Sequence, residues 1–373
     1  MRAICSACII FTKPQKKIIF SSFGGRKFDD SPRAIYDEIR KRNEFKEWDL
    51  VWVFCEPGKF EVPRGRKVKI DTLKFFYELM SSKIWVGNSG LDRGIGISKH
   101  GRIIEVDTWH GTPLKKIGGE ENKTSMLVDK GYQGKLDGET IRCAQSEYDR
   151  NIFMRVFHAT ENSFLMCDLP RNDKLLHYTE KELDFIREKL KIPENKKIIL
   201  YAPTYREYLT NKHGKTFMLP PVNMMKWRKK LGDKYILLVR AHYAVTEVMN
   251  IDNDDFFRNV SEYPVLNDLY VISDMLISDY SSSFIDYSIL ERPMFCFAYD
   301  LEEYKEQRGL YVDIEKELPC VVHKEEETLL EDIVHMDYSQ CVKKSHDFHM
   351  KYAPYSGSAG KVVVDEVIKK LKR

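Results

Sequence analysis

The sequence predicts an α/β fold built from two similar halves, each with its own parallel sheet. The chain has 373 residues, which is enough for two domains of ordinary size. Short apolar runs alternate along it with amphipathic, helix-like stretches, and this alternation is typical of β-α-β units. A second cycle of the same alternation starts near residue 170, and it predicts the second half.

The first half alternates buried strands with amphipathic helices. One helix is predicted over 31–42, where Ser31 can cap the N-terminus and Pro32 fits the first helical position. A second helix is predicted over 71–82. We interpret four apolar runs as buried strands, at 16–23, 49–56, 83–90 and 101–108.

The second half repeats this organisation. Thr179 and Glu182 form a predicted capping box, and Pro193 is predicted to end the helix that starts there. A short helix is expected after the serines at 281–283, and the stretch 345–373 has a helical pattern with a basic end. Buried strands are predicted at 196–204, 234–242, 271–282 and 292–300.

The composition is that of a globular protein, with 43% hydrophobic and 31% charged residues and no low-complexity tract. The chain has a net charge of +3, but residues 1–70 contain 16 Lys and Arg against 9 Asp and Glu. This basic region favours an anionic partner, namely a membrane surface, a polyphosphate acceptor or a nucleic acid, although a solvated basic face is the alternative. No window holds 18 apolar residues, so we expect only peripheral membrane contact.

The cysteines favour a reducing compartment, because most of them lie in apolar segments where buried, reduced thiols are common. Cys5 and Cys8 form a C-x-x-C pair, but no second pair stands at zinc-ligand spacing, so zinc is not favoured. The eight cysteines are Cys5, Cys8, Cys55, Cys143, Cys167, Cys296, Cys320 and Cys341.

Polar motifs follow several of the predicted strands directly, and in open α/β sheets ligands bind at these carboxyl ends. In the first half, His110 follows a strand, stands beside a glycine and precedes two lysines. It can be a general base next to a phosphate, or a structural histidine in a tight turn. In the second half the corresponding motifs lie at 202–206, 240–242 and 278–286.

The serines at 281–283 precede a predicted helix and can bind phosphate through hydroxyls and free N–H groups, or can simply cap the helix. Asp286 can accept a hydrogen bond from a ribose hydroxyl or support the helix dipole. Arg240 and His242 lie on the same side of an extended segment, which suits a pyrophosphate whose bridging bond breaks. An ion pair with a neighbouring carboxylate is the alternative for the arginine.

Arg171 and Arg206 are further candidate anion ligands. The chain has no Walker P-loop and no G-x-G-x-x-G fingerprint, so ATPase and nicotinamide-dependent activities are disfavoured.

Seven segments from about residue 16 to beyond 320 contain distinctive motifs. The most specific are TWHGTPLK at 108–115 and SDYSSSFIDY at 278–287. The others are KKIIFSSFGGRKFDDSPRAIY, DLPRNDKLL, ILYAPTYRE, LVRAH and RGLYVDIEKELP. Together, in this order and at this spacing, they are similar to motifs of the CDP-glycerol glycerophosphotransferase family of teichoic acid primases and polymerases, which has capsule polymerases among its relatives.

The resemblance implies a fold like that of the GT-B glycosyltransferases, with two Rossmann-like domains facing across a cleft. Residues 1–172 would form the acceptor-side domain with the catalytic histidine, and 173–345 the CDP-polyol-binding domain. Residues 346–373 would form a C-terminal helix that crosses back to the first domain. In the implied reaction, a terminal hydroxyl of the acceptor attacks the polyol-side phosphorus of the donor, and CMP leaves.

The resemblance also assigns roles to individual residues. His110 matches the catalytic base of the family, and His242 matches its second essential histidine, which contacts the donor phosphates. The positions that match the lining of the CDP-polyol pocket are Trp109, Gly111, Thr112, Pro113, Arg171, Pro203, Thr204, Arg240, Ala241, Ser281, Ser282 and Asp286.

The implied partners are a CDP-glycerol or CDP-ribitol donor, a lipid-linked polyol-phosphate acceptor and an anionic membrane surface at the cytoplasmic face of a bacterial cell, with no nucleic acid. No cofactor is expected, since no clustered Asp/Glu pair suggests a magnesium site, although isolated carboxylates leave a divalent metal open. Cys320 departs from the family pattern, because a glycine is expected after Leu-Pro.

Two other functions stay open at this point. A nucleotide-sugar glycosyltransferase or epimerase on the same fold would show carboxylates at a sugar pocket, and a non-catalytic module would be free to lose His110 or His242. The motifs do not distinguish a CDP-glycerol donor from a CDP-ribitol donor, or a primase from a polymerase. The sequence does not indicate the oligomeric state.

Overall fold

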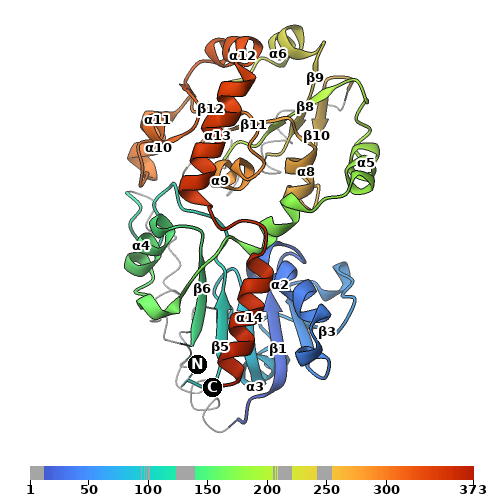
Figure 1. Cartoon of the computed structure of the whole chain (residues 1–373), viewed down its shortest axis with the longest axis vertical. Coiled ribbons are helices and arrows are strands. Elements are labelled where there is room, and N and C mark those ends of the chain that lie inside the picture. Colours follow the sequence, from blue (N-terminus) through green and yellow to red (C-terminus); the bar gives the residue numbers. More distant parts are fainter. Residues whose placement is uncertain are drawn as a thin grey trace. The chain divides into compact units, whose positions relative to one another are not determined.

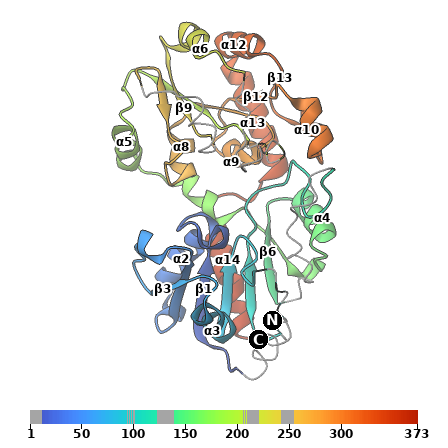
Figure 2. The same ribbon diagram turned by 180° about the vertical axis from the view of Figure 1, so that it is seen from behind.

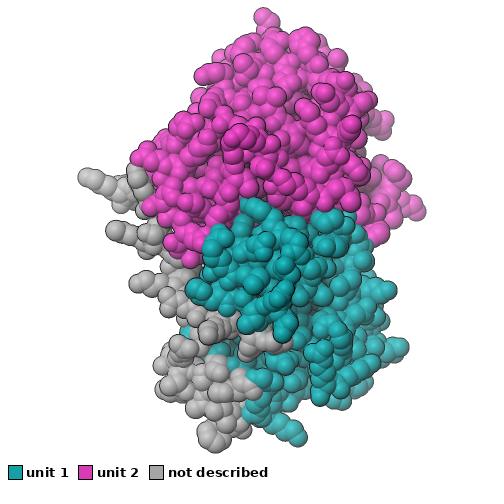
Figure 3. All heavy atoms as spheres, turned by 60° about the vertical axis from the view of Figure 1, so that its left-hand side comes forward, with its two compact units in different colours: residues 1–111, 128–173, 354–373 teal, residues 112–127, 174–353 magenta. Residues whose placement is uncertain are grey.

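The computed structural model describes residues 12–93, 95, 97, 99, 101–122, 139–204, 206, 208, 221–241 and 254–373. The chain divides into two compact units, which Figure 3 colours separately. Unit 1 comprises 1–111, 128–173 and 354–373, and unit 2 comprises 112–127 and 174–353. Each unit has its own sheet and its own hydrophobic core.

Unit 1 contains a seven-stranded parallel sheet in the order β3-β2-β1-β4-β5-β6-β7. The order reverses between β1 and β4, as in Rossmann-like folds, and a crevice for ligands forms at such a reversal. The strands are β1 (Gln15–Ser21), β2 (Asp49–Phe54), β3 (Arg66–Lys69), β4 (Ser82–Gly87), β5 (Ile104–Asp107), β6 (Thr140–Ala144) and β7 (Phe164–Met166).

Helices cover both faces of this sheet, as the opposite views of Figures 1 and 2 show. Helix α2 (Asp30–Lys41) packs beside α14 (Ala359–Leu371) on one face, where Val363, Val364 and Val367 of α14 join the core of the sheet. Helix α3 (Leu73–Ser81) lies on the other face and contributes Phe75 and Leu79 to a second cluster. Helix α4 (Glu147–Val156) connects β6 to the segment before β7.

Unit 2 contains a six-stranded parallel sheet in the order β10-β9-β8-β11-β12-β13, which reverses between β8 and β11. Both units are therefore Rossmann-like. The strands are β8 (Lys197–Tyr201), β9 (Tyr235–Val239), β10 (Phe257–Asn259), β11 (Met275–Ser278), β12 (Met294–Phe297) and β13 (Val322–His323).

The core of unit 2 is closed on one side by α6 and α12, which bury Trp227, Leu231, Leu329, Leu330 and Ile333 against the sheet. The helices are α5 (Glu180–Lys189), α6 (Met224–Leu231), α8 (Leu266–Ile272), α9 (Ser283–Ser288), α10 (Leu301–Gln307), α11 (Ile314–Glu317), α12 (Glu326–His335) and α13 (Tyr338–Tyr352). In the described part of the chain, none of the helices is both long and apolar enough to span a bilayer.

The predicted α/β fold is confirmed, and so is the capping box of Thr179 and Glu182 at the start of α5. Helix α5 ends at Lys189, four residues before Pro193, because Lys191 adopts a left-handed conformation with φ 54°. The predicted cap at Ser31 is wrong: the N-cap position of α2 is Asp29, and Ser31 lies inside the helix.

Two predicted elements differ from the structure by more than their end residues. The strand predicted at 271–282 starts too early, since Val271 and Ile272 form the last turn of α8 and β11 begins at Met275. A short apolar run does not distinguish a buried helix end from a strand. The helix predicted over 345–373 is two helices, because Pro354 lacks an N–H donor and Gly357 has φ 101°.

The domain limits and the cleft stay predictions. The chain passes between the units at 111/112, 173/174 and 353/354, and segment 112–127 belongs to unit 2. Helix α13 belongs to unit 2, and the segment from residue 354 onward packs with unit 1.

Candidate active site

The carboxyl ends of β1, β4 and β5 carry the candidate site of unit 1. Phe23 follows β1, Asn88 follows β4, and His110 stands three residues after β5. Because β1 and β4 are the neighbours at which the strand order reverses, these residues stand at the place where open α/β sheets usually bind ligands.

His110 is held in one tautomer. Its Nδ1 atom lies 2.8 Å from the carbonyl oxygen of Asn88. A carbonyl oxygen can only accept a hydrogen bond, so Nδ1 carries the proton and Nε2 keeps a free lone pair. The ring stacks on Trp109, with 4.1 Å between centroids, and lies 5.8 Å from the ring of Phe23.

The pKa of His110 lies below its ordinary value, mainly because burial disfavours the charged imidazolium. Arg171 lowers this pKa further, while the bond to Asn88 and the carboxylates of Asp30 and Asp107 oppose the shift. The ring is therefore neutral at pH 7, and its free Nε2 can take up a proton.

A polar network behind His110 contains Asn88, Asp30 and Arg171. The Asn88 amide donates to Asp30 (Nδ2 to Oδ1, 2.9 Å), and Arg171 donates to the second oxygen of Asp30 (Nη1 to Oδ2, 2.9 Å). Arg171 and Asp30 form an ion pair whose side chains are 12% and 8% exposed, so the cation is fixed in the site. The structure thus brings the predicted anion ligand Arg171 close to His110.

Asn88 and Asp30 were not predicted from the sequence. Asn88 had a usable signal, because it directly follows the apolar run at 83–87 and so stands at a strand end. Asp30 lies at the start of α2. Carboxylates are common at helix N-termini because they interact favourably with the helix dipole, so nothing in the sequence marks Asp30 as a site residue.

The chain leaves unit 1 after Gly111, the residue that follows His110. Gly111 has φ 146°, a conformation that favours glycine, and Thr112 and Pro113 are buried on the unit 2 side. The next residues pair with the loop after α10: the Lys116 amide donates to Gly309 O (3.0 Å), and the Tyr311 amide donates to Leu114 O (2.8 Å). We call residues 114–116 and 309–311 the strap pairing.

In unit 2, Arg206 forms a buried ionic cluster at the carboxyl ends of β8, β11 and β12. Its guanidinium makes two bonds to Asp300 (Nε 2.7 Å, Nη2 2.8 Å) and one to Asp279 (Nη1 2.9 Å). The Tyr280 hydroxyl donates to Asp300 at 2.8 Å, and the Thr204 amide donates to Asp279 at 2.9 Å. The two carboxylates already neutralise Arg206, and this arrangement does not favour the predicted role as an anion ligand.

The other donor-side residues of unit 2 follow β8, β9 and β11. Pro203 and Thr204 follow β8, and Arg240 follows β9, with its guanidinium donating to Tyr263 O at 2.6 Å. Ala241 is buried, and its amide donates to Ser261 Oγ at 3.1 Å. His242, the predicted contact of the donor phosphates, lies outside the described residues.

The serine motif follows β11 as predicted, but the helix behind it is short. Ser281 Oγ lies 2.8 Å from Ser283 Oγ and accepts the Ser283 amide at 3.1 Å. Ser282 occupies the N-cap position of α9 without a side-chain cap bond, and α9 has six residues. Asp286 is buried within α9.

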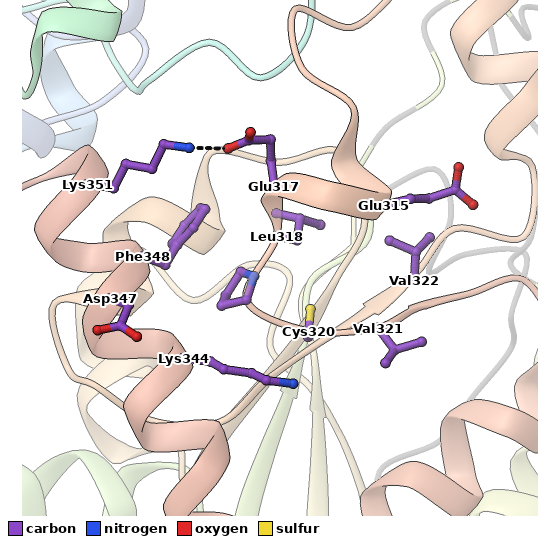
Figure 4. A pocket seen from close by; sticks show the side chains of 11 residues that line it. Glu315, Glu317, Leu318, Cys320, Val321, Val322, Lys344, Asp347, Phe348 and Lys351 are labelled. Atoms are coloured by element: carbon purple, nitrogen blue, oxygen red, sulfur yellow. Dashed lines mark hydrogen bonds and ion pairs between the residues drawn. The ribbon is translucent and has the colours of Figure 1, made fainter.

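A pocket of about 610 Å³ lies elsewhere on unit 2, between the segment that leads into β13 and helix α13 (Figure 4). Cys320, Lys344 and Phe348 line it, and none of the predicted site residues does. Burial raises the pKa of the Cys320 thiol, so the residue that replaces the expected glycine is an unreactive side chain here.

No group of three or more His, Cys, Asp and Glu residues within the described ranges is arranged to hold a metal ion.

Comparison with known proteins identifies relatives over almost the whole chain. A family model described as CDP-glycerol:poly(glycerophosphate) glycerophosphotransferase matches residues 5–369. A teichoic acid glycerol-phosphate transferase of Staphylococcus aureus is 34% identical over 338 residues, which are 87% of this chain and 85% of the relative. A teichoic acid poly(glycerol phosphate) polymerase of Staphylococcus epidermidis is 32% identical over 96% of this chain, and the chain spans only 51% of that relative.

Solved structures agree with this assignment. The wall teichoic acid polymerase TagF superposes with a TM-score of 0.86 at 30% identity, over 100% of this chain and 93% of that one. A histidine-to-asparagine variant of TagF soaked with CDPG gives a TM-score of 0.87. A UDP-GlcNAc 2-epimerase from Neisseria meningitidis, with a TM-score of 0.57 and 11% identity, shares the fold alone.

Proposed function

The chain belongs to the CDP-glycerol:poly(glycerophosphate) glycerophosphotransferase family, and from this we propose that it transfers polyol phosphate from a CDP-polyol to a hydroxyl of a teichoic-acid-type acceptor, releasing CMP. One observation carries the proposed chemistry: a neutral imidazole, fixed by the Asn88 carbonyl, stands at the strand-order reversal of unit 1. The chain spans about half of the Staphylococcus epidermidis relative, so the activity of that longer protein is not transferred to it as a whole.

In the proposed step, His110 is the general base. An alcohol has a pKa far above 7, so attack at neutral pH needs a group that removes its proton. Nε2 of His110 accepts the hydroxyl proton while the acceptor oxygen bonds to the polyol-side phosphorus. The bond from this phosphorus to the bridging oxygen breaks, and CMP leaves with that oxygen.

Arg171 is suited to the negative charge that gathers on the phosphoryl oxygens during this step, because its guanidinium is anchored by Asp30 close to His110. On the donor side, Arg240, Ser281 and Ser282 are proposed to hold the phosphates of the CDP-polyol, together with His242. We propose that the transfer needs no cofactor, which activity after treatment with a chelator tests directly.

Glycerol phosphate is the favoured group. Relatives that act on glycerol phosphate are 32% and 34% identical to the chain, whereas a ribitol-phosphate primase and a poly(ribitol-phosphate) polymerase of Bacillus spizizenii are 24% and 25% identical. Identity does not separate a primase from a polymerase, since a glycerol-phosphate primase of the same organism is also 32% identical.

The proposed setting is the cytoplasmic face of a bacterial membrane, with a lipid-linked acceptor. The relatives come from Staphylococcus and Bacillus species. The basic composition of residues 1–70 suits an anionic lipid or a polyphosphate chain.

The deciding experiment is CMP release by the purified protein. CDP-glycerol and CDP-ribitol are offered separately, each with a short glycerol-phosphate-primed lipid acceptor, and the products are sized. We expect release with CDP-glycerol, and the product length separates one added unit from many. No release with either donor from folded protein contradicts the proposal, and UDP-GlcNAc is then the next donor to test because of the shared fold.

A further inference from the structure

We propose that Asn88 and Asp30 are positioning residues for His110, which together hold the imidazole with Nε2 directed at the substrate. The inference rests on the proposed function of His110 as the general base, and it assigns to this site two residues that were not among the predicted site residues. It is carried by the hydrogen bonds of Asn88, by the burial of Asp30 and by the backbone conformations around them.

Asn88 is fully buried and is held at three points. Its carbonyl oxygen accepts from His110 Nδ1 at 2.8 Å. Its side-chain oxygen accepts from the Phe23 amide at 2.8 Å, and its side-chain nitrogen donates to Asp30 Oδ1 at 2.9 Å. The side-chain bonds anchor Asn88, which directly follows β4, to the loop after β1 and to α2, so the carbonyl that orients His110 has little freedom to move.

Asp30 is the fixed end of this arrangement. Both of its oxygens accept hydrogen bonds: Oδ1 from Asn88 Nδ2 and from the Ser31 amide (2.7 Å), and Oδ2 from Arg171 Nη1 (2.9 Å). A carboxylate with 8% of its side chain exposed needs such donors, because an unpaired buried charge is very costly. The negative charge of Asp30 also raises the pKa of His110, which opposes the lowering by Arg171.

The backbone around His110 is strained at three non-glycine residues. Phe23, Asp30 and Trp109 have φ values of 48°, 67° and 53°, in the left-handed region. Each such conformation costs about 1–3 kcal/mol and persists only where the surroundings impose it. Phe23 and Trp109 pack their rings against His110, and Asp30 anchors Asn88. Three of the eight non-glycine residues with positive φ in the described part of the chain thus contact His110 or anchor Asn88.

A purely structural role would make a different prediction. If Asn88 and Asp30 only closed the loop between β1 and α2, their replacement would lower the melting temperature and leave the protonation of His110 unchanged. The charged groups that act on His110 are Asp30, Arg171 and Asp107. The removal of one of these charges should therefore shift the pKa of His110 in a known direction. Without the Asp30 carboxylate, the pKa of His110 must fall further.

The test uses the full chain labelled with ¹⁵N-histidine, with the His110 signal assigned by its loss in His110→Ala. In the wild type we expect the Nδ1–H tautomer. In Asp30→Asn we expect the pKa of His110 to fall by about 0.5–1 pH unit, because a nearby opposite charge is lost. In Asn88→Ala we expect a mixture of tautomers. In both variants kcat should fall about 10- to 100-fold, a part of what a positioned general base contributes, with a smaller change in KM.

The matched control is Asp49→Asn, which removes a carboxylate from an ion pair with Arg66 in the same unit and should leave the His110 signals and kcat unchanged. Wild-type tautomer and pKa in both Asp30→Asn and Asn88→Ala overturn the inference, whatever the activity. If one variant does not fold, the other decides. If the wild type releases no CMP, the proposed function fails, and the NMR signals still report on the positioning.

Discussion

The site residues of the two units stand at the carboxyl ends of their sheets but are held in different ways. In unit 1, His110 bonds directly to a neutral carbonyl, and the ion pair of Arg171 and Asp30 acts on it only through Asn88 and at a distance. In unit 2, the loops after β8, β11 and β12 are joined by the buried charges of Arg206, Asp279 and Asp300. A base must exchange protons, so a neutral partner suits it, whereas loops that only need a fixed shape can be held by a permanently charged guanidinium.

The comparison therefore predicts that activity and stability respond separately in the two units. Changes at His110 should remove the chemistry and spare the fold, while changes at Arg206 should damage the fold of unit 2 first. The predictions below test this separation, beginning with the largest effect.

His110→Ala should lower the rate of CMP release by about 100- to 10,000-fold, which is what a general base contributes. Its melting temperature should stay close to that of the wild type. The replacement removes one side-chain hydrogen bond, to the carbonyl oxygen of Asn88, so we expect the fold to persist. His335→Ala, at an exposed histidine of α12, is the control. Turnover like that of the wild type in His110→Ala removes the base from the mechanism.

Arg206→Met should lower the free energy of unfolding of unit 2 by about 3–5 kcal/mol, because two buried carboxylates lose their shared cation. Chemical denaturation measures the change. Arg93→Met breaks an exposed ion pair with Asp71 in unit 1 and should have a smaller effect. An Arg206 variant as stable as the wild type would show that the cluster serves ligand binding instead.

The pH dependence of kcat/KM should show an acid limb below the ordinary histidine pKa of about 6.5, since burial lowers the pKa of His110. The rate rises as the imidazole loses its proton and then reaches a plateau. The same shift affects stability. Below about pH 6.5, His110 is protonated in the unfolded chain but still neutral in the folded chain. The unfolded state is therefore favoured, and the contribution of neutral His110 to the free energy of unfolding is lost as the pH falls through the pKa of the folded chain. An acid limb above pH 6.5 contradicts the assignment.

Thr179→Ala should have the smallest effect, a loss of about 0.5–2 kcal/mol from the capping box of α5 with unchanged kcat. It provides the scale for a local change in unit 2 that involves neither site. A fall in kcat for this variant would mean that activity follows the stability of unit 2 in general, and the separation between the units would not hold.

Much of the fold could be predicted from the sequence, because buried parallel strands appear in it as continuous apolar runs. The same runs locate the strand ends to within a few residues, so the sequence predicts His110, Thr204 and Ser281 close to the ends of β5, β8 and β11, and the structure has each of them three residues after the strand. Local patterns failed where the partner is distant. Nothing near Arg206 indicates that Asp300 will neutralise it, and nothing near Asn88 indicates the bond to Asp30. The strap pairing likewise joins segments almost 200 residues apart, beyond the reach of any periodicity.

Helix α14 has a consequence for biosynthesis. Its valines at 363, 364 and 367 complete the core of unit 1, yet they are translated after all of unit 2. While residues 174–358 are being made, roughly 10–40 s at common bacterial or eukaryotic rates, the α14 side of the first sheet has no final cover. The growing chain therefore exposes apolar β surface through the synthesis of an entire second unit. Its folding yield should depend on chaperones that shield this surface, and on translation speed through the second half of the message.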